Sequence, residues 1–370
     1  MSNPTTTKTY FAPGRVNLIG EHLDYNGGLV LPAALTIGIT ATYTTRPDNK
    51  IILHSATHPL QKEIDLADPI IFDPKNDWTN YPLGVINQLI KENHFVGGCE
   101  IVYSSNLPEG SGLSSSAAIE VLTAYLLLKQ TEQNISLSWL AGLCKQVEIE
   151  FVGMQCGIMD QFAIARGKAE NAILLNCTNL DYSYIPFELN NYRLLILNSK
   201  KPRSLIHSKY NERKSESDEA LRILQATSSI QNLCEASFPQ LDLILDETIK
   251  KRARHVITES LRVKEAVKAL RFNDLSTFGR LMNASHTSMK NDYEITGLEM
   301  DTLAEEAQKL KGCLGARMTG GGFGGCAIAL VHEDAISEFN HILTFKYHAA
   351  TGLNCEIYVS EIGNGVEEKL

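Results

Sequence analysis

A run of glycines and serines that passes directly into an apolar helical pattern is the strongest constraint on how this chain folds. It reads Asn106-Leu-Pro-Glu-Gly-Ser-Gly-Leu-Ser-Ser-Ser-Ala-Ala118, and the helical pattern continues to residue 128. Gly110 and Gly112 let backbone N–H groups approach an anion without a Cβ atom in the way. The serines at 114–116 fall at the helix start, where unpaired N–H groups and the helix dipole favour negative charge. The loop predicts a phosphate site, although a serine N-cap after a turn would have the same sequence.

Composition limits the class of protein. The chain has 370 residues, which favours two domains over a single core. Lys and Arg number 34 against 43 Asp and Glu, and a net charge of −9 argues against a nucleic-acid-binding surface. The densest basic cluster, residues 250–254, opens a helical pattern, and we interpret it as a solvated helix face.

Cysteine usage and hydropathy indicate the compartment. The eight cysteines form no C-x-x-C pair and have no accompanying histidine cluster, which argues against structural zinc. Reduced, mostly buried thiols in a cytosolic protein are the simplest interpretation. Residues 1–10 lack the apolar core of a signal peptide, and the longest apolar runs are too short to span a bilayer.

A second stretch, residues 13–28, is dense in polar groups. Carboxylates bind sugar hydroxyls strongly and directionally, so such a set suits a polyhydroxylated ligand. An exposed charged loop would have the same spacing, and spacing alone does not choose between the two. The polar residues lie within twelve positions of one another: Arg15, Glu21, His22, Asp24 and Asn26.

Two further segments carry candidate chemistry. Asp160 stands in an apolar, glycine-flanked segment, residues 156–161, after a predicted helix that contains Glu148. A buried carboxylate needs partners, so Asp160 is either a structural hydrogen-bond anchor or a catalytic base. Residues 320–325 contain five glycines in six positions. Because ordering such a loop costs backbone entropy, we expect its backbone to approach a ligand or the first loop closely.

Strand and helix patterns are mixed along the chain, which argues for α/β layers. Predicted strands cover residues 33–45, 50–54, 63–66, 98–104, 172–177, 192–198 and 326–330. Predicted helices cover residues 81–92, 117–129, 139–151, 241–249, 255–270 and 300–310. The strand at 192–198 is expected to open a second domain, and a last strand at 355–359 can pack on either domain.

Three of these stretches, residues 13–22, 110–118 and 319–326, together resemble the GHMP small-molecule kinases. Residues 21–28, 156–161 and 208–213 are similar to the galactokinase branch of that family. The resemblance implies an α+β fold of two mixed α/β domains, residues 1–190 and 191–370, with the active site in the cleft between them. It implies ATP-dependent phosphorylation of the C1 hydroxyl of α-D-galactose. The alternatives are a related kinase for N-acetylgalactosamine, galacturonate or arabinose, and a non-catalytic sugar and ATP sensor.

The matched motifs imply a role for each residue. Asp160 is implied as the catalytic base, and Arg15 as the arginine that keeps it ionised and stabilises the transferring phosphoryl group. The implied galactose contacts are Glu21, His22, Leu23, Asp24, Gly157, Asp160 and Tyr210. The implied ATP contacts are Ser55, Gly110, Ser111, Gly112, Leu113, Ser114, Ser115 and Ser116. Mg²⁺ accompanying ATP is expected at Ser116 and Glu148.

The resemblance also implies partners and setting. We expect D-galactose and ATP as ligands, no nucleic-acid or membrane partner, a cytoplasmic location, and a monomer or weak oligomer. The chain has neither a Walker A motif nor the protein-kinase H-R-D and D-F-G set, so backbone amides and serine hydroxyls must hold the phosphates. Three positions depart from the galactokinase pattern. Leu23 stands in place of the usual threonine, Asn176 in place of an aspartate, and Gly321 in place of the commoner alanine. Leu23 lies between two implied sugar contacts, so it bears on sugar preference.

Overall fold

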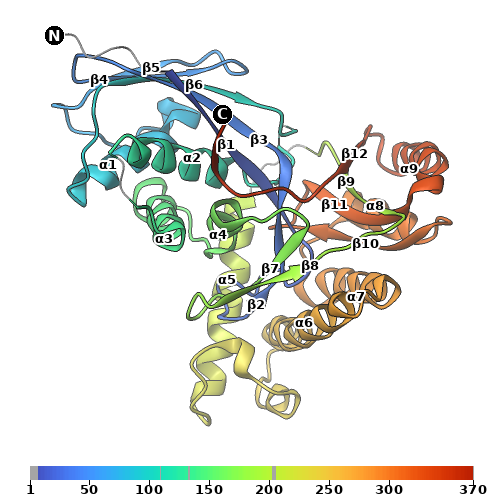
Figure 1. Cartoon of the computed structure of the whole chain (residues 1–370). Helices are drawn as coiled ribbons and strands as arrows, with labels where there is room; N and C mark the ends of the chain where they lie inside the picture. The colour runs from blue at the N-terminus through green and yellow to red at the C-terminus, as the bar shows by residue number, and fades with distance from the viewer. Residues whose placement is uncertain (1–6, 109, 132–133, 202–205, 370) are drawn as a thin grey trace.

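The N-terminal half of the molecule is a twisted sheet covered on one face by helices (Figure 1). The computed structural model describes residues 7–108, 110–131, 134–201 and 206–369. The sheet runs in the order β13 (Glu367–Lys369), β1 (Thr7–Asn17), β3 (Pro32–Thr45), β6 (Cys99–Ser105), β4 (Lys50–Ser55), β5 (Lys62–Asp65). Its helices are α1 (Asn80–Lys91), α2 (Ser115–Lys129), α3 (Leu137–Val147) and α4 (Met159–Arg166). Helix α2 is apolar on almost every side because it is buried between the sheet and helices α1, α3 and α4.

The C-terminal half is built on a second, four-stranded sheet. Its strands run in the order β10 (Cys313–Thr319), β11 (Cys326–His332), β9 (Tyr192–Asn198), β12 (Glu356–Ser360). Strand β11 is buried along almost its whole length, which explains its continuous apolar sequence. Helices α7 (Leu275–Ser288) and α8 (Leu298–Gln308) pack on β10, and α9 (Ile336–Thr351) packs on α8. Helices α5 (Ile206–Gln225) and α6 (Glu247–Arg271) pack on each other.

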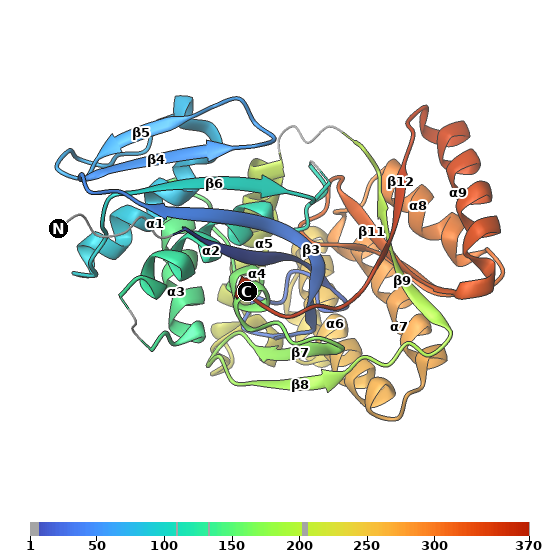
Figure 2. The ribbon, with the colours of Figure 1, turned by 45° about the horizontal axis from the view of Figure 1, so that its top comes forward.

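A small third sheet and the end of the chain join the two halves. The third sheet has the order β2 (Leu29–Val30), β7 (Asn171–Asn176), β8 (Tyr182–Pro186). The predicted strand at 355–359 is β12, which pairs with β9 of the C-terminal sheet. The chain then crosses back, and β13 pairs with the outer edge of β1 (Figure 2). The expected division at residue 190 stays a prediction, and beyond it β13 covers an edge strand of the N-terminal sheet.

The structure corrects several sequence predictions. The helix predicted at 241–249 is wrong: a 3₁₀ segment, Phe238–Leu243, is followed by a break, and α6 begins at Glu247. The carboxylate of Asp246 accepts from the backbone N–H groups of Thr248 and Ile249, and this N-cap sets the helix start. The interpretation of residues 250–254 as a solvated face is wrong for Arg252, which is only 2% exposed.

Other predicted boundaries shift. The helix predicted at 139–151 ends as α-helix at Val147 and continues as a π-helical turn, Glu148–Val152. Helices α4 and α9 and strand β8 were not predicted from the sequence. Among the described residues, every helix is too short or too polar to cross a membrane.

Candidate active site

A cleft of about 1070 Å³, counting its solvent-open part, brings together residues from both halves of the chain. Most of the residues implied by sequence line it. They are Arg15, Glu21, His22, Asp24, Gly110, Ser111, Gly112, Ser114, Ser115, Ser116, Glu148, Gly157, Asp160 and Tyr210.

Arg15 and Asp160 form a bidentate ion pair in this cleft. Arg15 lies at an irregularity of β1, where the pairing register with β3 shifts between Pro13 and Arg15. Its Nε donates to Oδ1 of Asp160 at 2.7 Å, and its Nη2 donates to Oδ2 at 2.6 Å. The Ser114 hydroxyl donates to the same Oδ2. These charge-assisted bonds orient the carboxylate, whose side chain remains 30% exposed.

Asp24 is a second carboxylate in the cleft, and it is held against the backbone of Gly157. A Cβ atom on Gly157 would lie 1.8 Å from Oδ2 of Asp24, so only glycine allows this approach. Burial raises the pKa of Asp24 to about 6, and the charge of Asp160 adds to this shift. Two carboxylates with different surroundings therefore share one cleft.

The first glycine-rich loop opens helix α2 as predicted. Gly110, Gly112 and Ser114 all have positive φ, at 64°, 74° and 62°. The Ser114 hydroxyl donates to Asp160 instead of capping the helix. The first N–H groups of α2 are thereby left for an anionic ligand, in the electrostatic field of the helix N-terminus.

The residues expected to hold Mg²⁺ lie together at this helix start. Glu148 and Ser116 both line the cleft, and Nε2 of Gln161 donates to Oε2 of Glu148 at 3.0 Å. Burial raises the pKa of Glu148, and the side chains of Cys156 and Ser116 partly oppose that shift. Oε1 of Glu148 is buried and finds no hydrogen-bond partner among the described residues. A buried, unpaired carboxylate oxygen beside a serine hydroxyl fits a hard cation.

Glu21, which is implied as a sugar contact, lines the cleft and is also held by neighbouring protein groups. It is 1% exposed, and its carboxylate pairs with the fully buried guanidinium of Arg317. Nδ2 of Asn17 donates to its Oε2 at 2.9 Å, and the backbone N–H of Gly320 donates to its Oε1 at 2.9 Å. Burial outweighs Arg317 and raises the pKa of Glu21 to about 7. The carboxylate therefore connects strand β1 to the second glycine-rich loop.

The second glycine-rich loop approaches the first, as the sequence predicts. A Cβ atom on Gly320 would lie 3.4 Å from the carbonyl oxygen of Gly112 and 3.8 Å from Nη2 of Arg15. A Cβ atom on Gly321 would meet the ring of Tyr210 at 3.5 Å, an ordinary contact, so alanine would fit at this position. The departure at Gly321 thus leaves the shape of the cleft nearly unchanged.

Three implied contacts lie outside the cleft. Leu23 is fully buried in the hydrophobic core, so its departure from threonine does not change the cleft wall. The Ser55 hydroxyl accepts from the backbone N–H groups of Thr57 and His58 at the end of β4. Leu113 is 1% exposed, but its carbonyl oxygen accepts from the backbone N–H of Arg15 at 3.1 Å.

Sequence reasoning missed several residues of the cleft and its support. The missed lining residues are Met154, Cys156, Met159, Gln161 and Asn211. Glu259 was also missed: it is fully buried, and its carboxylate accepts from the backbone N–H of Gly20 at 2.9 Å and from the Ser285 hydroxyl at 2.7 Å. Arg262, three residues further along α6, also pairs with Glu259, but the contacts with Gly20 and Ser285 join distant parts of the chain and leave no local pattern.

A second hollow adjoins the cleft and shares Met154 and Asn211 with it. Phe72, Tyr81 and Val152 contribute aromatic and apolar surface to its wall. Such a wall is suited to a flat heterocycle.

Three family models match this chain. They are the GHMP kinases N terminal domain over residues 80–168, the galactokinase galactose-binding signature over residues 2–45, and the GHMP kinases C terminal domain over residues 264–349.

Curated relatives and solved structures agree with these models. The galactokinase of Clostridium acetobutylicum is 45% identical over 365 residues, covering 97% of this chain and 94% of the relative. The galactokinase of Lactiplantibacillus plantarum is 45% identical over 367 residues, covering 98% of this chain and 95% of the relative. The crystal structure of Lactococcus lactis galactokinase complexed with galactose matches with a TM-score of 0.94 at 45% identity, covering 98% of this chain and 95% of that one. A mevalonate kinase structure, at 22% identity and a TM-score of 0.70, shares the fold.

Proposed function

Since this chain belongs to the GHMP kinase family, and within it to the galactokinases, we propose that it transfers the γ-phosphoryl group of ATP to the C1 hydroxyl of α-D-galactose. The reaction makes galactose 1-phosphate and ADP. The observation that carries the proposal is the Arg15–Asp160–Ser114 arrangement, which faces the same cleft as the N-terminus of α2.

Asp160 is proposed as the general base for the sugar hydroxyl. Its carboxylate is oriented by Arg15 and Ser114, and it is exposed to the cleft. A base placed this way removes the hydroxyl proton as the oxygen attacks the phosphoryl group. The Arg15 guanidinium is close enough to stabilise negative charge that develops on the transferring group.

The phosphates are proposed to lie against the N–H groups of residues 110–116 at the start of α2. Ser116 and Glu148 would hold the Mg²⁺ that accompanies ATP, and that ion would neutralise charge on the phosphate oxygens. The second hollow, walled by Phe72 and Tyr81, continues from the cleft and suits the adenine base.

The sugar is proposed to lie on the other side of Asp160. Asp24 supplies carboxylate acceptors for sugar hydroxyls, and the Tyr210 ring lines the same wall. The side chain of Leu23 makes no substrate contact in this proposal, because it is buried away from the cleft. A galactose-like preference is therefore compatible with the leucine.

The cellular setting is part of the same proposal. No disulfide joins any of the eight cysteines, which supports a reducing compartment such as the cytoplasm. We propose a monomer or weak oligomer, which size-exclusion chromatography with light scattering would test.

The test is a coupled ADP-release assay with ATP and Mg²⁺. D-galactose is compared with glucose, N-acetylgalactosamine, galacturonate, arabinose, mevalonate and homoserine. We expect turnover with galactose well above every other substrate. A preference for another sugar would overturn the substrate assignment, and galactose binding without any ADP release would support a sensor.

Asp160→Asn tests the base. Turnover should fall by about 10²-fold or more, because general-base catalysis contributes at least that factor, while galactose binding is largely retained. Turnover is measured by ADP release and binding by calorimetry. Asp181→Asn, on the exposed segment before β8, is the matched control and should be neutral. If Asp160→Asn keeps more than about a tenth of the turnover, Asp160 is not the base.

A further inference from the structure

Gln161 follows the proposed base Asp160 in the first turn of α4, and its side chain is fully buried at the wall of the cleft. Successive residues of a helix point about 100° apart, so the two side chains leave α4 in different directions. The Gln161 amide turns to Glu148, where its Nε2 donates to Oε2 at 3.0 Å. One helical turn therefore contacts both the proposed base and a proposed cation ligand.

The charge of Glu148 decides which end of the Gln161 amide must face it. A carboxylate that binds a cation is ionised and can only accept hydrogen bonds, so the amide has to present its Nε2 and not its Oε1. The bond occupies Oε2 of Glu148. The other oxygen, Oε1, is buried and has no hydrogen-bond partner in the described part of the chain. Gln161 thus determines which carboxylate oxygen stays free for a cation.

Two other groups act on the same carboxylate, but neither replaces the amide. The side chains of Cys156 and Ser116 lower the pKa of Glu148 against the effect of burial. A thiol is a weak hydrogen-bond donor, and Ser116 is itself proposed as a ligand of the cation. Gln161 supplies a strong, neutral donor that does not compete for the cation.

A second carboxyl group shows why a donor is needed at this position. Glu120 of α2 is fully buried, and neither of its oxygens has a hydrogen-bond partner among the residues that the structure describes. Burial raises the pKa of Glu120 well above its ordinary value, the charge of Glu148 adds to this shift, and the Gln161 side chain opposes it.

The packing of α4 places the Gln161 amide close to both carboxyl groups. Helix α4 packs on α2, which carries Glu120, and on α3, which leads into Glu148. An amide NH2 group has two N–H donors and can serve two acceptors, whereas a further acceptor here would face oxygens that already lack donors.

We propose that Gln161 is a positioning residue for the cation that accompanies ATP: its amide holds Glu148 so that one carboxylate oxygen stays free for that cation. The proposal rests on the proposed function for the identity of the cation, Mg²⁺ bound with ATP. In it, Gln161 touches neither galactose nor the phosphates and acts only through Glu148.

Gln161→Met keeps the length of the side chain, removes its donors and tests the proposal. The free Mg²⁺ needed for half-maximal ADP release should rise by about 10- to 100-fold, the range for a metal ligand that loses its supporting hydrogen bond. The KM for galactose should stay within about twofold, because the sugar lies on the other side of Asp160.

Calorimetry with a non-hydrolysable ATP analogue gives a second readout that does not depend on turnover. The affinity for the analogue is measured with Mg²⁺ and with EDTA. We expect Mg²⁺ to strengthen binding to the wild type, and Gln161→Met to lose most of that gain while its affinity in EDTA is unchanged.

A double-mutant cycle tests whether Gln161 acts through Glu148. Glu148→Gln removes the carboxylate itself, so adding Gln161→Met to it should change the Mg²⁺ response of analogue binding little further. Effects that multiply in the double variant would show that Gln161 acts by another route and would overturn the proposal.

Gln88→Met is the matched control. Nε2 of Gln88 also donates to a carboxylate, Oε1 of Glu92, at 2.8 Å, but Gln88 lies in α1 and lines neither the cleft nor the adjoining hollow. This variant should leave the response to Mg²⁺ unchanged. If Gln161→Met does not fold, Gln161→Asn decides the question, because its amide is one methylene too short to reach Glu148.

The proposal is overturned if Gln161→Met loses thermal stability as Gln88→Met does and keeps the wild-type response to Mg²⁺. A wild type whose affinity for the analogue does not depend on Mg²⁺ would overturn it as well. Failure of the proposed function would look different. In that case the wild type would not turn over galactose, while calorimetry would still show that Gln161→Met loses the Mg²⁺-dependent gain in analogue binding.

Discussion

At the residue scale, two carboxylates face one cleft in different surroundings. Asp160 receives hydrogen bonds from Arg15 and Ser114. Asp24 is pressed against Gly157, and its pKa is raised to about 6, from an ordinary value of 3.8, chiefly because it is buried. Asp24 therefore changes charge just below neutral pH.

This difference predicts a pH dependence of galactose binding. Below about pH 6, Asp24 gains a proton and becomes a weaker acceptor for hydroxyls, so the KM for galactose should rise as the pH falls from about 8 to 5. Asp24→Asn should raise the KM at every pH and flatten this profile. Steady-state kinetics across the range make the comparison, and an equally steep profile in Asp24→Asn would contradict the assignment.

The same pKa has a consequence for stability. Since the folded state binds the Asp24 proton more tightly than the unfolded chain does, the stability it contributes is fully present below about pH 4 and lost as the pH rises through about 6. Asp24→Asn should remove this part of the pH dependence of the unfolding temperature.

Gly157→Ala should disturb the cleft at one point. The added Cβ atom would overlap Oδ2 of Asp24 at 1.8 Å, so Asp24 must move. We expect a rise of about tenfold or more in the KM for galactose, corresponding to a loss of about 1.4 kcal/mol or more. Gly142→Ala is the matched control, because nothing lies within 4 Å of its Cβ position inside α3. That control should be neutral or slightly stabilising, as thermal unfolding would show. Unchanged galactose kinetics in Gly157→Ala would place Asp24 outside the sugar site.

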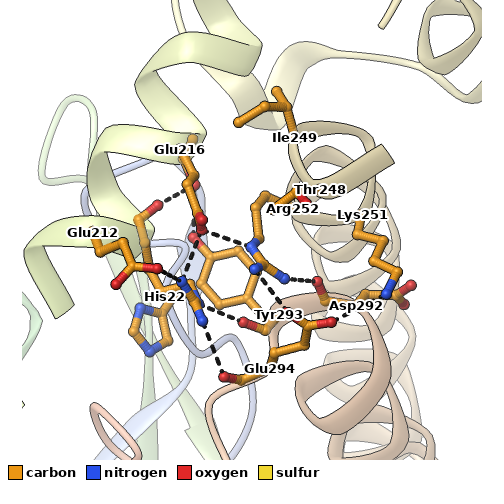
Figure 3. Close-up of polar contacts among 12 residues, drawn as sticks. His22, Glu212, Glu216, Thr248, Ile249, Lys251, Arg252, Asp292, Tyr293 and Glu294 are labelled. Atoms are coloured by element: carbon orange, nitrogen blue, oxygen red, sulfur yellow. Dashed lines mark hydrogen bonds and ion pairs between the residues drawn. The ribbon is translucent and has the colours of Figure 1, made fainter. Parts of the chain in front are cut away.

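At the scale of elements, two arginines connect helices α5 and α6 to the turn Met289–Tyr293. Arg213 of α5 and Arg252 of α6 both donate hydrogen bonds to residues 292–294. Arg252 is 2% exposed, and it donates from Nε to Glu216 at 2.7 Å and from Nη2 to Glu294 at 2.9 Å. Glu294 follows the turn in the left-handed region at φ 55°. One residue of the basic cluster 250–254 in α6, Arg252, therefore has a structural role, because it connects α6 to Glu216 of α5 and to Glu294 (Figure 3).

Arg252→Ala should lower the free energy of unfolding by about 2–4 kcal/mol, because it removes a buried guanidinium that donates to the Asp292 carbonyl and to the carboxylates of Glu216 and Glu294. The neighbouring Lys251 is the matched control, since its ion pair with Glu294 is exposed. Lys251→Ala should change the stability by less than about 1 kcal/mol. Urea unfolding measures the stability change in both variants, and equal changes would contradict the structural role of Arg252.

At the scale of the whole molecule, contacts far apart in sequence hold the halves together. The backbone N–H of Asn17 donates to the Thr319 hydroxyl at 3.0 Å, and Glu21 pairs with Arg317. The end of the chain adds to this connection, because Ile362 and Val366 are buried and β13 covers the edge of β1. The relative position of the two halves, and so the shape of the cleft, depends on the contacts between residues 17–21 and 317–319 and on the pairing of β13 with β1.

Deleting residues 361–370 should therefore destabilise the N-terminal half. Loss of the buried Ile362 and Val366 side chains costs about 3–6 kcal/mol, and the uncovered edge of β1 invites aggregation. Thermal unfolding and light scattering report the two effects. Lys369→Ala, which removes an exposed ion pair with Glu367 and a cation–π contact with Phe11 but leaves the rest of β13 in place, is the control. A truncated protein that unfolds at the wild-type temperature would contradict the proposed role of β13.

The sequence by itself determined the chemistry of the loops and the order of the main elements. Residues 106–118 and 320–325 could be interpreted because backbone freedom at glycine and helix-start chemistry are local properties. The sequence also placed Asp160 and Arg15 in one site, through the resemblance of their motifs. It misplaced the start of α6, because apolar spacing alone does not locate an N-cap such as Asp246.

Only the tertiary structure decided which polar groups face the cleft and which serve the core. Asp24, Glu21 and His22 all line the cleft, but Glu21 also bonds to Arg317 and Gly320, and the His22 ring lies within hydrogen-bond distance of Gly321 and Tyr25. Leu23, between His22 and Asp24 in the sequence, is buried in the hydrophobic core. These assignments depend on burial and on partners up to about 300 positions away, and local spacing along the chain carries no record of such partners.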